Sequence, residues 1–266
     1  MSRVSVIIPV RNGAATIESA VNSLVWQTYD DLKIIIVNDR STDNTYQLCE
    51  RMADASGKIV LVNNTGQGIS SALNYAIALS DSEYIARMDA DDISFPERIA
   101  RQVDLLDNAP QIAVVGSSFM RFGALNKHAF VPIGEDACYY CSRLFSPFCH
   151  PTTVFRRSAL AATGGGYDGS YDGAEDFELF SRMLDSFQGT NIEEPLFAYR
   201  IHPSQVSATQ SARQKSLSRR IIKRNVGKVV AEMGQIKAYK TILENIPRPM
   251  VPNALRSFRA LMPGIG

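Results

Sequence analysis

The sequence predicts an α/β protein with a mostly parallel central sheet, helices on both faces and a helical tail. Three observations support this fold class. Apolar runs alternate with helical patterns through the first half of the chain, polar clusters follow these runs, and the charge balance changes near residue 210. With 266 residues and 45% hydrophobic content, the chain is long enough for one sizeable core and an appendage.

The first half of the chain is the more regular. Strands are expected at residues 4–10, 32–39, 58–64, 83–88 and 111–122. Apolar residues at helical spacing follow the first and third strands, and helix-start signals in "STDNTYQLCERMAD" follow the second. Ser94, Pro96 and Glu97 form the pattern of a capping box that would open a helix over 96–108. This strand and helix order implies parallel strands with right-handed crossovers and a ligand crevice at their carboxyl ends.

The second half of the chain is less regular. In order, we expect a loop-rich stretch at 123–150, a strand at 152–157, a glycine cluster at 164–173, a helix at 175–186, a strand at 195–201 and a linker at 202–212. We therefore divide the chain into a domain over 1–210 and a basic helical tail over 211–266.

Charge is unevenly distributed along the chain. Residues 211–266 hold 12 Lys and Arg against 2 Asp and Glu, whereas the rest of the chain holds 16 against 25. No run of about 18 apolar residues is present, the amino terminus turns polar too early for a secretory signal, and four cysteines suit a reducing compartment. We expect a cytoplasmic protein.

Two other kinds of ligand site find little support in the sequence: a zinc site and a glycine-rich phosphate-binding loop. Cys138 and Cys141, with Cys149 and His150 after them, could form a zinc site, but the first two fit i, i+3 neighbours on a short helix better. The glycine patterns of dinucleotide-binding and P-loop proteins are missing, because the first strand leads into "PVRNGAAT", which has one glycine. A phosphate ligand would then be held through a metal.

Three aspartates follow the fourth strand in "YIARMDADDISFPER". Asp89 and Asp91 form a D-x-D pair, and side chains two positions apart point the same way in an extended segment. Such a pair suits a divalent cation that bridges to a nucleotide diphosphate. The alternative is a solvated acidic turn before helix 96–108.

Four motifs in order resemble the family 2 glycosyltransferases. These are "VSVIIPVRNGAATIESAVNSLVWQTYDDLKIIIVNDRSTDNT" with "YIARMDADD", then "CHPTTVFRRSAL" with "GGYD", then "GAEDFELFSRM" and "FAYRIHPSQVS". Together they cover roughly residues 3–207 and leave the tail outside. The resemblance implies a GT-A fold, a nucleotide-diphosphate sugar donor and a Mn²⁺ or Mg²⁺ cofactor.

The resemblance also implies roles for residues around the nucleotide. Asp39 would hydrogen-bond the base, commonly uracil, although "VND" stands here where many relatives have "VDD". Asp89, with Ala90 beside it, would approach the ribose, and Arg87 would point towards the same crevice or serve as an ion-pair partner. The nucleoside pocket would be lined by Pro9, Val10, Arg11 and Asn12.

For metal and catalysis, the resemblance implies Asp91 and His202 as metal-binding residues. Asp176, at the start of a helix, would be the general base, with Glu175 as the second candidate; acidic residues there also stabilise helices without any other role. His150 precedes a segment that relatives place near the acceptor.

The sequence thus predicts an inverting hexosyltransferase that moves a sugar, from a UDP-sugar in the first instance, to a hydroxyl of a glycan or lipid-linked acceptor in cell-surface polysaccharide synthesis. The alternatives are a nucleotidyltransferase or a catalytically silent glycan-binding protein of the same fold. The tail either lies on an anionic membrane at the inner face of the cell membrane or packs on the domain. No nucleic-acid partner is expected, because the acidic body would repel it.

Overall fold

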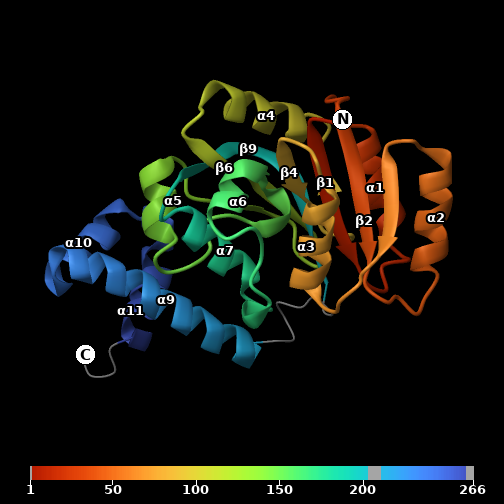
Figure 1. Ribbon diagram of the computed structural model, residues 1–266. Helices are drawn as coiled ribbons and strands as arrows, with labels where there is room; N and C mark the ends of the chain where they lie inside the picture. The colour runs from red at the N-terminus through yellow and green to blue at the C-terminus, as the bar shows by residue number, and fades with distance from the viewer. Residues whose placement is uncertain (1, 203–210, 262–266) are drawn as a thin grey trace.

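The computed structural model describes residues 2–202 and 211–261, and Figure 1 shows their arrangement. The first part alternates strands and helices as expected: β1 (Val4–Val10), α1 (Ile17–Val25), β2 (Leu32–Asn38), α2 (Thr45–Ala55), β3 (Ile59–Asn63), α3 (Ile69–Leu79), β4 (Tyr84–Arg87), β5 (Ile93–Ser94), α4 (Arg98–Asn108) and β6 (Ile112–Gly123). Each strand predicted in this half is present within two residues of its expected bounds.

The second part contains β7 (Lys127–Ala129), α5 (Glu135–Cys141), β8 (Val154–Arg156), α6 (Arg157–Ala162), α7 (Glu175–Met183) and β9 (Gln188–Ile201). Short 3-10 turns lie between them at η1 (His150–Thr152) and η2 (Gly169–Tyr171). The stretch 123–150, expected to be mostly loop, therefore holds a strand and a helix, and β9 begins seven positions before the expected start at 195. The linker expected at 202–212 falls largely outside the described residues.

One mixed sheet runs through the molecule in the order β3-β2-β1-β4-β8-β6-β9-β5, with β7 beside β6. The first four strands are parallel, as are β6 and β9. Strand β8 is antiparallel to both of its neighbours, β4 and β6. The carboxyl ends of β1, β2, β3 and β4 therefore meet at one edge, where loops from distant parts of the sequence can assemble a site.

Helices cover both faces of this sheet (Figure 1). Alternate residues of β1 point in opposite directions: Val6 and Ile8 join a core with α1, α2 and α4, whereas Ile7 joins a core with α3, α6 and α7. All three side chains are fully buried. Apolar residues on both faces explain why β1 and β2 appear in the sequence as continuous apolar runs.

The capping box expected at α4 is wrong. Ser94 lies in β5, where it pairs with Phe197 of β9, and Glu97 is exposed and makes no capping hydrogen bond. Gln27, from the segment after α1, accepts the hydrogen bond of the Ile99 N–H at 3.0 Å and so caps the helix. A partner distant in sequence replaces the local motif.

The tail forms α9 (Ser211–Met233), α10 (Gln235–Asn245), η3 (Arg248–Met250) and α11 (Val251–Leu261). Its apolar face packs on the domain: Ile221, Ile222 and Val226 lie in one buried cluster with Phe177 of α7 and Leu144. Asn225, fully buried, donates to the Ser142 carbonyl at 2.9 Å. No helix of the described residues is both long and apolar enough to cross a bilayer.

Candidate active site

The three aspartates after β4 form one acidic cluster at the carboxyl edge of the sheet. Asp89, Asp91 and Asp92 each present a carboxylate oxygen, and these oxygens lie within 4.8 Å of one another. Among the described residues this is the one group of acidic, cysteine and histidine side chains spaced to hold a metal ion. The cysteines form no such group: the Cys138 thiol donates to the Pro132 carbonyl instead.

Strand β9 supplies the second wall of this acidic cluster. The Nε2 atom of His202 lies 2.9 Å from Oδ2 of Asp91. Arg200 donates its backbone N–H to Asp92 Oδ1 and its Nε to the Asp91 carbonyl, both at 2.7 Å. The end of β9 is thereby fastened to the loop after β4, so two segments far apart in sequence are held as one unit.

Crowding and burial set the protonation of this acidic cluster. Burial, then the Asp89 and Asp91 carboxylates, raise the pKa of Asp92 to about 9. Burial and the charge of Asp89 also raise the pKa of Asp91, against an opposing effect of His202. The second carboxylate oxygen of Asp92 is buried without a hydrogen-bond partner in the described chain. Three mutually repelling carboxylates with an unused oxygen fit a hard divalent cation.

Arg87 lies beneath the cluster at the end of β4 and is 2% exposed. Its Nη1 atom lies 2.5 Å from Asp89 Oδ2, so it is an ion-pair partner of the first aspartate. Burial raises the pKa of Glu175 and Asp176 at the start of α7, and the Arg87 charge acts against that rise in both. The sequence-predicted residues of β4 and α7 are therefore electrostatic neighbours.

The two acidic residues of α7 have different surroundings. Glu175 is buried, and its Oε2 accepts the Gly173 N–H at 2.6 Å. Burial and the neighbouring Asp176 raise the pKa of Glu175 to about 7. Asp176 is half-buried; burial raises its pKa, against the Phe177 N–H, the Arg87 charge and the side chain of Ser146. The Glu175 carboxylate accepts a hydrogen bond from the backbone just before its own helix. Of the two carboxylates, Asp176 is the one on which the side chain of Ser146 acts.

At the other end of the edge, Asp39 follows β2 and is 8% exposed. One of its oxygens accepts from Asn64 Nδ2 at 2.8 Å, and the other from the Gly68 N–H at 3.1 Å. Its backbone N–H donates to the Val10 carbonyl at 2.8 Å. These contacts fix the carboxylate between the ends of β1, β2 and β3.

The residues predicted to line the nucleoside pocket lie at the end of β1 and in the loop that follows it. Val10 is 3% exposed and packs in the core, and Arg11 is exposed. Asn12 has a φ of 53°, and its side-chain oxygen accepts the Thr42 N–H at 2.8 Å. A Cβ on Gly13 would lie 3.7 Å from Ala90 and 2.7 Å from a Val10 methyl group, so glycine lets this loop approach the aspartates closely.

His150 is not a member of the acidic cluster. It is 9% exposed, its Nε2 lies 2.8 Å from the Tyr167 hydroxyl, and burial and the Arg87 charge hold its pKa well below the ordinary value. It is therefore a neutral, packed imidazole.

Three residues of this site were not predicted from the sequence. Asp92 is visible as the third aspartate of "DADD". Arg200 stands two positions before His202 and so shares its direction on an extended strand. Asn64 follows β3, the strand next to β2. Its place at the same sheet edge as Asp39 is the sequence signal that could have identified it.

Comparison with known proteins gives the family. A model described as Glycosyl transferase family 2 matches residues 5–162. The putative glycosyltransferase EpsE of Bacillus subtilis (strain 168) is 32% identical over 210 residues, which cover 74% of this chain and 73% of EpsE. The O-antigen biosynthesis glycosyltransferase WbnJ of Escherichia coli is 26% identical over 76% of this chain and 81% of WbnJ. The amylovoran biosynthesis glycosyltransferase AmsE of Erwinia amylovora is 25% identical over 63% of this chain and 64% of AmsE.

Solved structures share the fold. S. aureus TarS 1-349 in complex with UDP-GlcNAc superimposes with a TM-score of 0.74 at 14% identity, over 96% of this chain and 79% of TarS 1-349. The mannosyltransferase PcManGT from Pyrobaculum calidifontis, in complex with GDP-Man and Mn²⁺, gives a TM-score of 0.65 at 19% identity, over all of this chain and 76% of PcManGT. The fold is therefore GT-A, and the chain belongs to the family 2 glycosyltransferases.

Proposed function

We propose that the protein transfers a sugar from a nucleotide-diphosphate donor to a hydroxyl of a glycan or lipid-linked acceptor during cell-surface polysaccharide synthesis, with inversion at the anomeric carbon. One observation carries this proposal: His202, just after β9, contacts Asp91 of the acidic cluster after β4, and buried Arg87 pairs with Asp89 of that cluster and acts electrostatically on the acidic start of α7. The names of the relatives, which act in amylovoran and O-antigen biosynthesis, support the pathway class.

The nucleoside would lie along the ends of β1 and β2. Asp39 is held in place by Asn64 and Gly68, and carboxylate oxygens retain lone pairs for a donor on the base. Pro9 and Val10, at the end of β1, and Arg11 and Asn12, in the loop after it, would border the nucleoside. Asp89 and Ala90, next to Gly13, would lie beside the ribose. The donors bound by TarS and PcManGT, UDP-GlcNAc and GDP-Man, support a nucleotide sugar and leave the base open.

Asp91 and His202 would hold the metal, with Asp89 and Asp92 around it. The buried, unpartnered oxygen of Asp92 fits a Mn²⁺ or Mg²⁺ ion, and PcManGT binds Mn²⁺ with its donor. A divalent ion there supplies charge stabilisation for the departing diphosphate. Arg87 adds a fixed positive charge below the same oxygens.

Asp176 would act as the general base. It would accept the proton of an acceptor hydroxyl while that oxygen forms a bond to the anomeric carbon of the donor. The bond between the anomeric carbon and the diphosphate oxygen breaks in the same displacement, and the electron pair leaves with the nucleoside diphosphate. A positioned base of this kind contributes about 10²–10⁴ in rate.

The experiment that tests this function measures the products formed from a panel of nucleotide sugars with and without Mn²⁺. We expect metal-dependent release of a nucleoside diphosphate from at least one donor. Release of pyrophosphate from a sugar phosphate and a nucleoside triphosphate would instead support the nucleotidyltransferase. Glycan binding with no turnover of any donor would support the catalytically silent protein.

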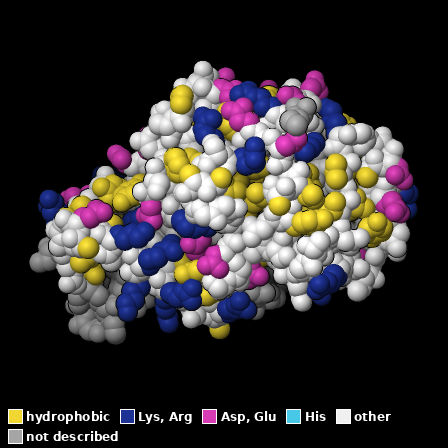
Figure 2. Space-filling view, viewed as in Figure 1, with side chains coloured by type: hydrophobic (Ala, Val, Ile, Leu, Met, Phe, Trp, Pro, Cys, Tyr) yellow, Lys and Arg dark blue, Asp and Glu magenta, His cyan; other side chains and the backbone are white. Residues whose placement is uncertain are grey.

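We also propose that α9 rests on an anionic membrane surface. Figure 2 shows Lys and Arg side chains gathered over the surface where α9 lies. Arg219 and Lys223 are exposed on this helix, while its apolar face is buried on the domain. The cationic face remains available for anionic lipids even though the helix is packed.

A further inference from the structure

The helix that carries Asp176 begins directly after the short turn η2. The Ala174 N–H, one residue before α7, donates to the Tyr171 carbonyl at 2.7 Å, and the Glu178 N–H donates to the Ala174 carbonyl at 3.0 Å. Asp176 is the second residue of α7 and lies in the turn that these two hydrogen bonds begin. The place of η2 therefore sets the place of Asp176.

Helix α3 holds η2 on one side. The Ser70 hydroxyl donates to the Asp172 carboxylate, and Ser70 is 1% exposed. Gly68 lies against the same carboxylate, because a Cβ on this glycine would be 2.9 Å from Asp172 Oδ2. The N–H of Gly68 donates to Asp39 at 3.1 Å. Segment 168–172 is thus fastened to the part of the molecule that holds Asp39.

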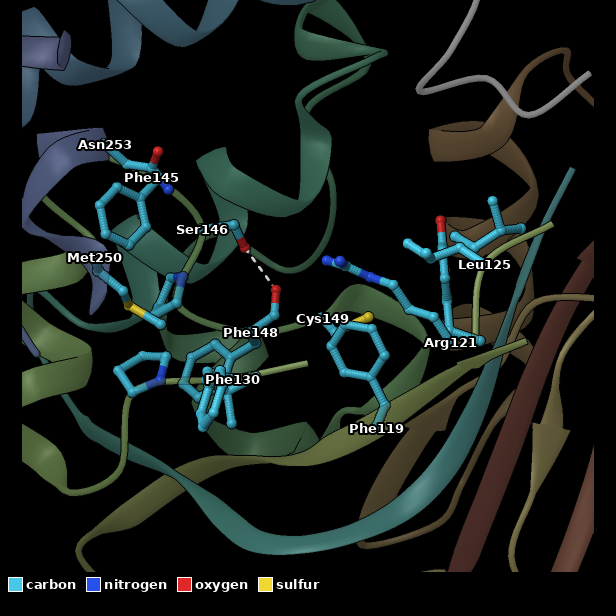
Figure 3. Close-up of a pocket in the computed structure, with 15 residues that line it drawn as sticks. Phe119, Arg121, Leu125, Phe130, Phe145, Ser146, Phe148, Cys149, Met250 and Asn253 are labelled. Atoms are coloured by element: carbon cyan, nitrogen blue, oxygen red, sulfur yellow. Dashed lines mark hydrogen bonds between the residues drawn. The ribbon is translucent and has the colours of Figure 1, made fainter. Parts of the chain in front are cut away.

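Segment 145–149 contributes apolar packing to α7. The Phe148 ring packs edge-on against Phe180 of this helix, with 5.1 Å between the ring centroids. The Ser146 hydroxyl donates to the Phe148 carbonyl at 2.9 Å, as the dashed line in Figure 3 shows. A hydroxyl has one proton to donate, and Ser146 uses it within its own segment.

The tail helix α9 holds η2 from a further side, below α7 in the view of Figure 1. The Arg220 guanidinium carbon lies 4.2 Å from the centre of the Tyr171 ring, and the Arg220 Nε donates to the Tyr171 hydroxyl at 3.0 Å. Tyr171 is 8% exposed and lies in one buried cluster with Phe177 of α7 and Ile221 of α9. Tyr171 therefore joins the tail to the residue that precedes α7.

A buried carboxylate extends this contact along α7. Glu178 is 3% exposed and accepts hydrogen bonds from Arg224 of α9 at 3.0 Å and from Arg182 of α7 at 3.1 Å. Arg224 also donates to the Ser181 hydroxyl at 2.9 Å, and Arg182 donates to the Gly166 carbonyl at 2.7 Å. Buried charges require such partners. Arg182 remains a partner of Glu178 when Arg224 is replaced, so the carboxylate stays paired.

We propose that α9 positions the general base: it holds the first turn of α7 so that Asp176 meets the acceptor hydroxyl in a reactive geometry. Arg220 does this through Tyr171, and Arg224 does it through Glu178. Both arginines act through another residue and are therefore positioning residues. The inference rests on the proposed function, because it takes Asp176 as the base. It gives the tail a role in sugar transfer that is separate from membrane docking.

Arg220→Gln and Arg224→Gln test this inference, with Lys228→Gln as the matched control. Lys228 also joins α9 to the domain, but its partner Asp185 lies beyond the end of α7. We expect each of the first two variants to lower the transfer rate at saturating substrates about 10- to 100-fold, since a small misplacement of a reacting group costs this much. Affinity for UDP with Mn²⁺ should stay at the wild-type value, because β9 holds the acidic cluster. Lys228→Gln should change neither quantity.

Hydrogen exchange, measured by mass spectrometry on the full chain, reports the same hold without donor, acceptor or turnover. Peptides over residues 168–178 should exchange faster in Arg220→Gln and Arg224→Gln than in Lys228→Gln and the wild type. Peptides of β2 should exchange alike in all four proteins. Arg220→Lys and Arg224→Lys keep a charged donor and should restore part of both the transfer rate and the protection.

A wild-type transfer rate in both glutamine variants would overturn the inference, as would a lower rate with unchanged exchange over 168–178. A lower rate with an equal loss of UDP affinity, or with faster exchange of β2, would also overturn it, because general destabilisation would then explain the loss. Failure of the wild type to release a nucleoside diphosphate would instead refute the proposed function. In that case the exchange measurement alone decides whether α9 holds the start of α7.

Discussion

The Nε2 atom of His202 lies 2.9 Å from Oδ2 of Asp91, although 111 positions separate the two residues. This contact joins the last described residue of the domain to the loop after β4. It places an imidazole nitrogen and a carboxylate oxygen, two common metal ligands, at one point of the sheet edge.

We expect Asp91→Ala to abolish metal-dependent binding of UDP, because it removes the carboxylate at the centre of the cluster. His202→Ala should weaken Mn²⁺ binding about 10- to 100-fold, whether the imidazole binds the ion or orients Asp91. Calorimetry with UDP, with and without Mn²⁺, measures both effects. Asp81→Ala is the control, since Asp81 pairs with Lys33 just before β4 begins, at the other end of the strand. Unchanged binding by Asp91→Ala would exclude the metal assignment.

Asp176→Asn should lower the transfer rate by about 10²–10⁴ and leave donor affinity unchanged, because the amide keeps the shape of the side chain but does not accept the acceptor's proton. Initial rates and UDP titrations measure the two quantities separately. Asp104→Asn, at an exposed position on α4, should behave like the wild type. A wild-type rate for Asp176→Asn would show that another group is the base.

The transfer rate should fall as the pH decreases through the raised pKa of Asp176, at a higher pH than for an ordinary aspartate. The pKa of Glu175 is raised to about 7 and that of Asp176 is also raised, so the pair takes up protons at a higher pH than isolated carboxylates do. A base accepts a proton only in its ionised form, which gives the sign of the effect. Glu175→Gln removes a neighbouring negative charge and should move this decline to lower pH. A pH profile that is level below neutrality in the wild type would contradict this assignment.

Ile221→Ala should reduce the free energy of unfolding by about 2–5 kcal/mol, since Ile221 is fully buried between α9 and the domain. Urea unfolding provides the measurement. Leu255→Ala, at a position that is 43% exposed, should change it by less than about 0.5 kcal/mol. Similar values for the two variants would mean that the tail does not share the core of the domain.

The double variant Arg219→Glu with Lys223→Glu should reduce binding to vesicles of phosphatidylglycerol and phosphatidylcholine, since each cation near an anionic surface contributes about 1 kcal/mol. Sedimentation measures the bound fraction, and pure phosphatidylcholine vesicles should bind neither protein. Arg51→Glu with Arg101→Glu, on α2 and α4, is the control of equal charge change. A truncation at residue 210 is unsuitable, because it would expose the buried cluster around Ile221. Equal sedimentation of both double variants with anionic vesicles would exclude docking through α9.

The sequence predicted the first half of the fold well because its strands are buried on both faces and its signals are local. Prediction failed where residues distant in sequence decide the structure. Ser94 looked like a helix cap, but pairing with Phe197 places it in a strand. The amino-terminal part of β9 is polar and partly exposed, so no apolar pattern revealed it before residue 195.

The candidate site shows the same difference between local sequence signals and contacts made by residues distant in sequence. The family motifs are the basis for predicting the carboxylates and His202 as site residues, because these residues stand in characteristic strings. Arg200 and Asn64 act through hydrogen bonds to Asp92 and Asp39, and these contacts exist only after the sheet has formed. Arg220 carried no motif, and only the packing of α9 shows its contact with Tyr171.

Met250 and Asn253 line a pocket together with residues of β6 and of the segments 125–132 and 145–149, although both lie beyond residues 5–162, the part that the family model matches. One wall of the molecule is thus built from two stretches of chain, one inside the family match and one beyond it. Grafting the carboxyl-terminal helices of a relative onto residues 1–210 would change the part of this wall that Met250 and Asn253 supply and leave the strand ends that carry Asp39 and the acidic cluster unchanged.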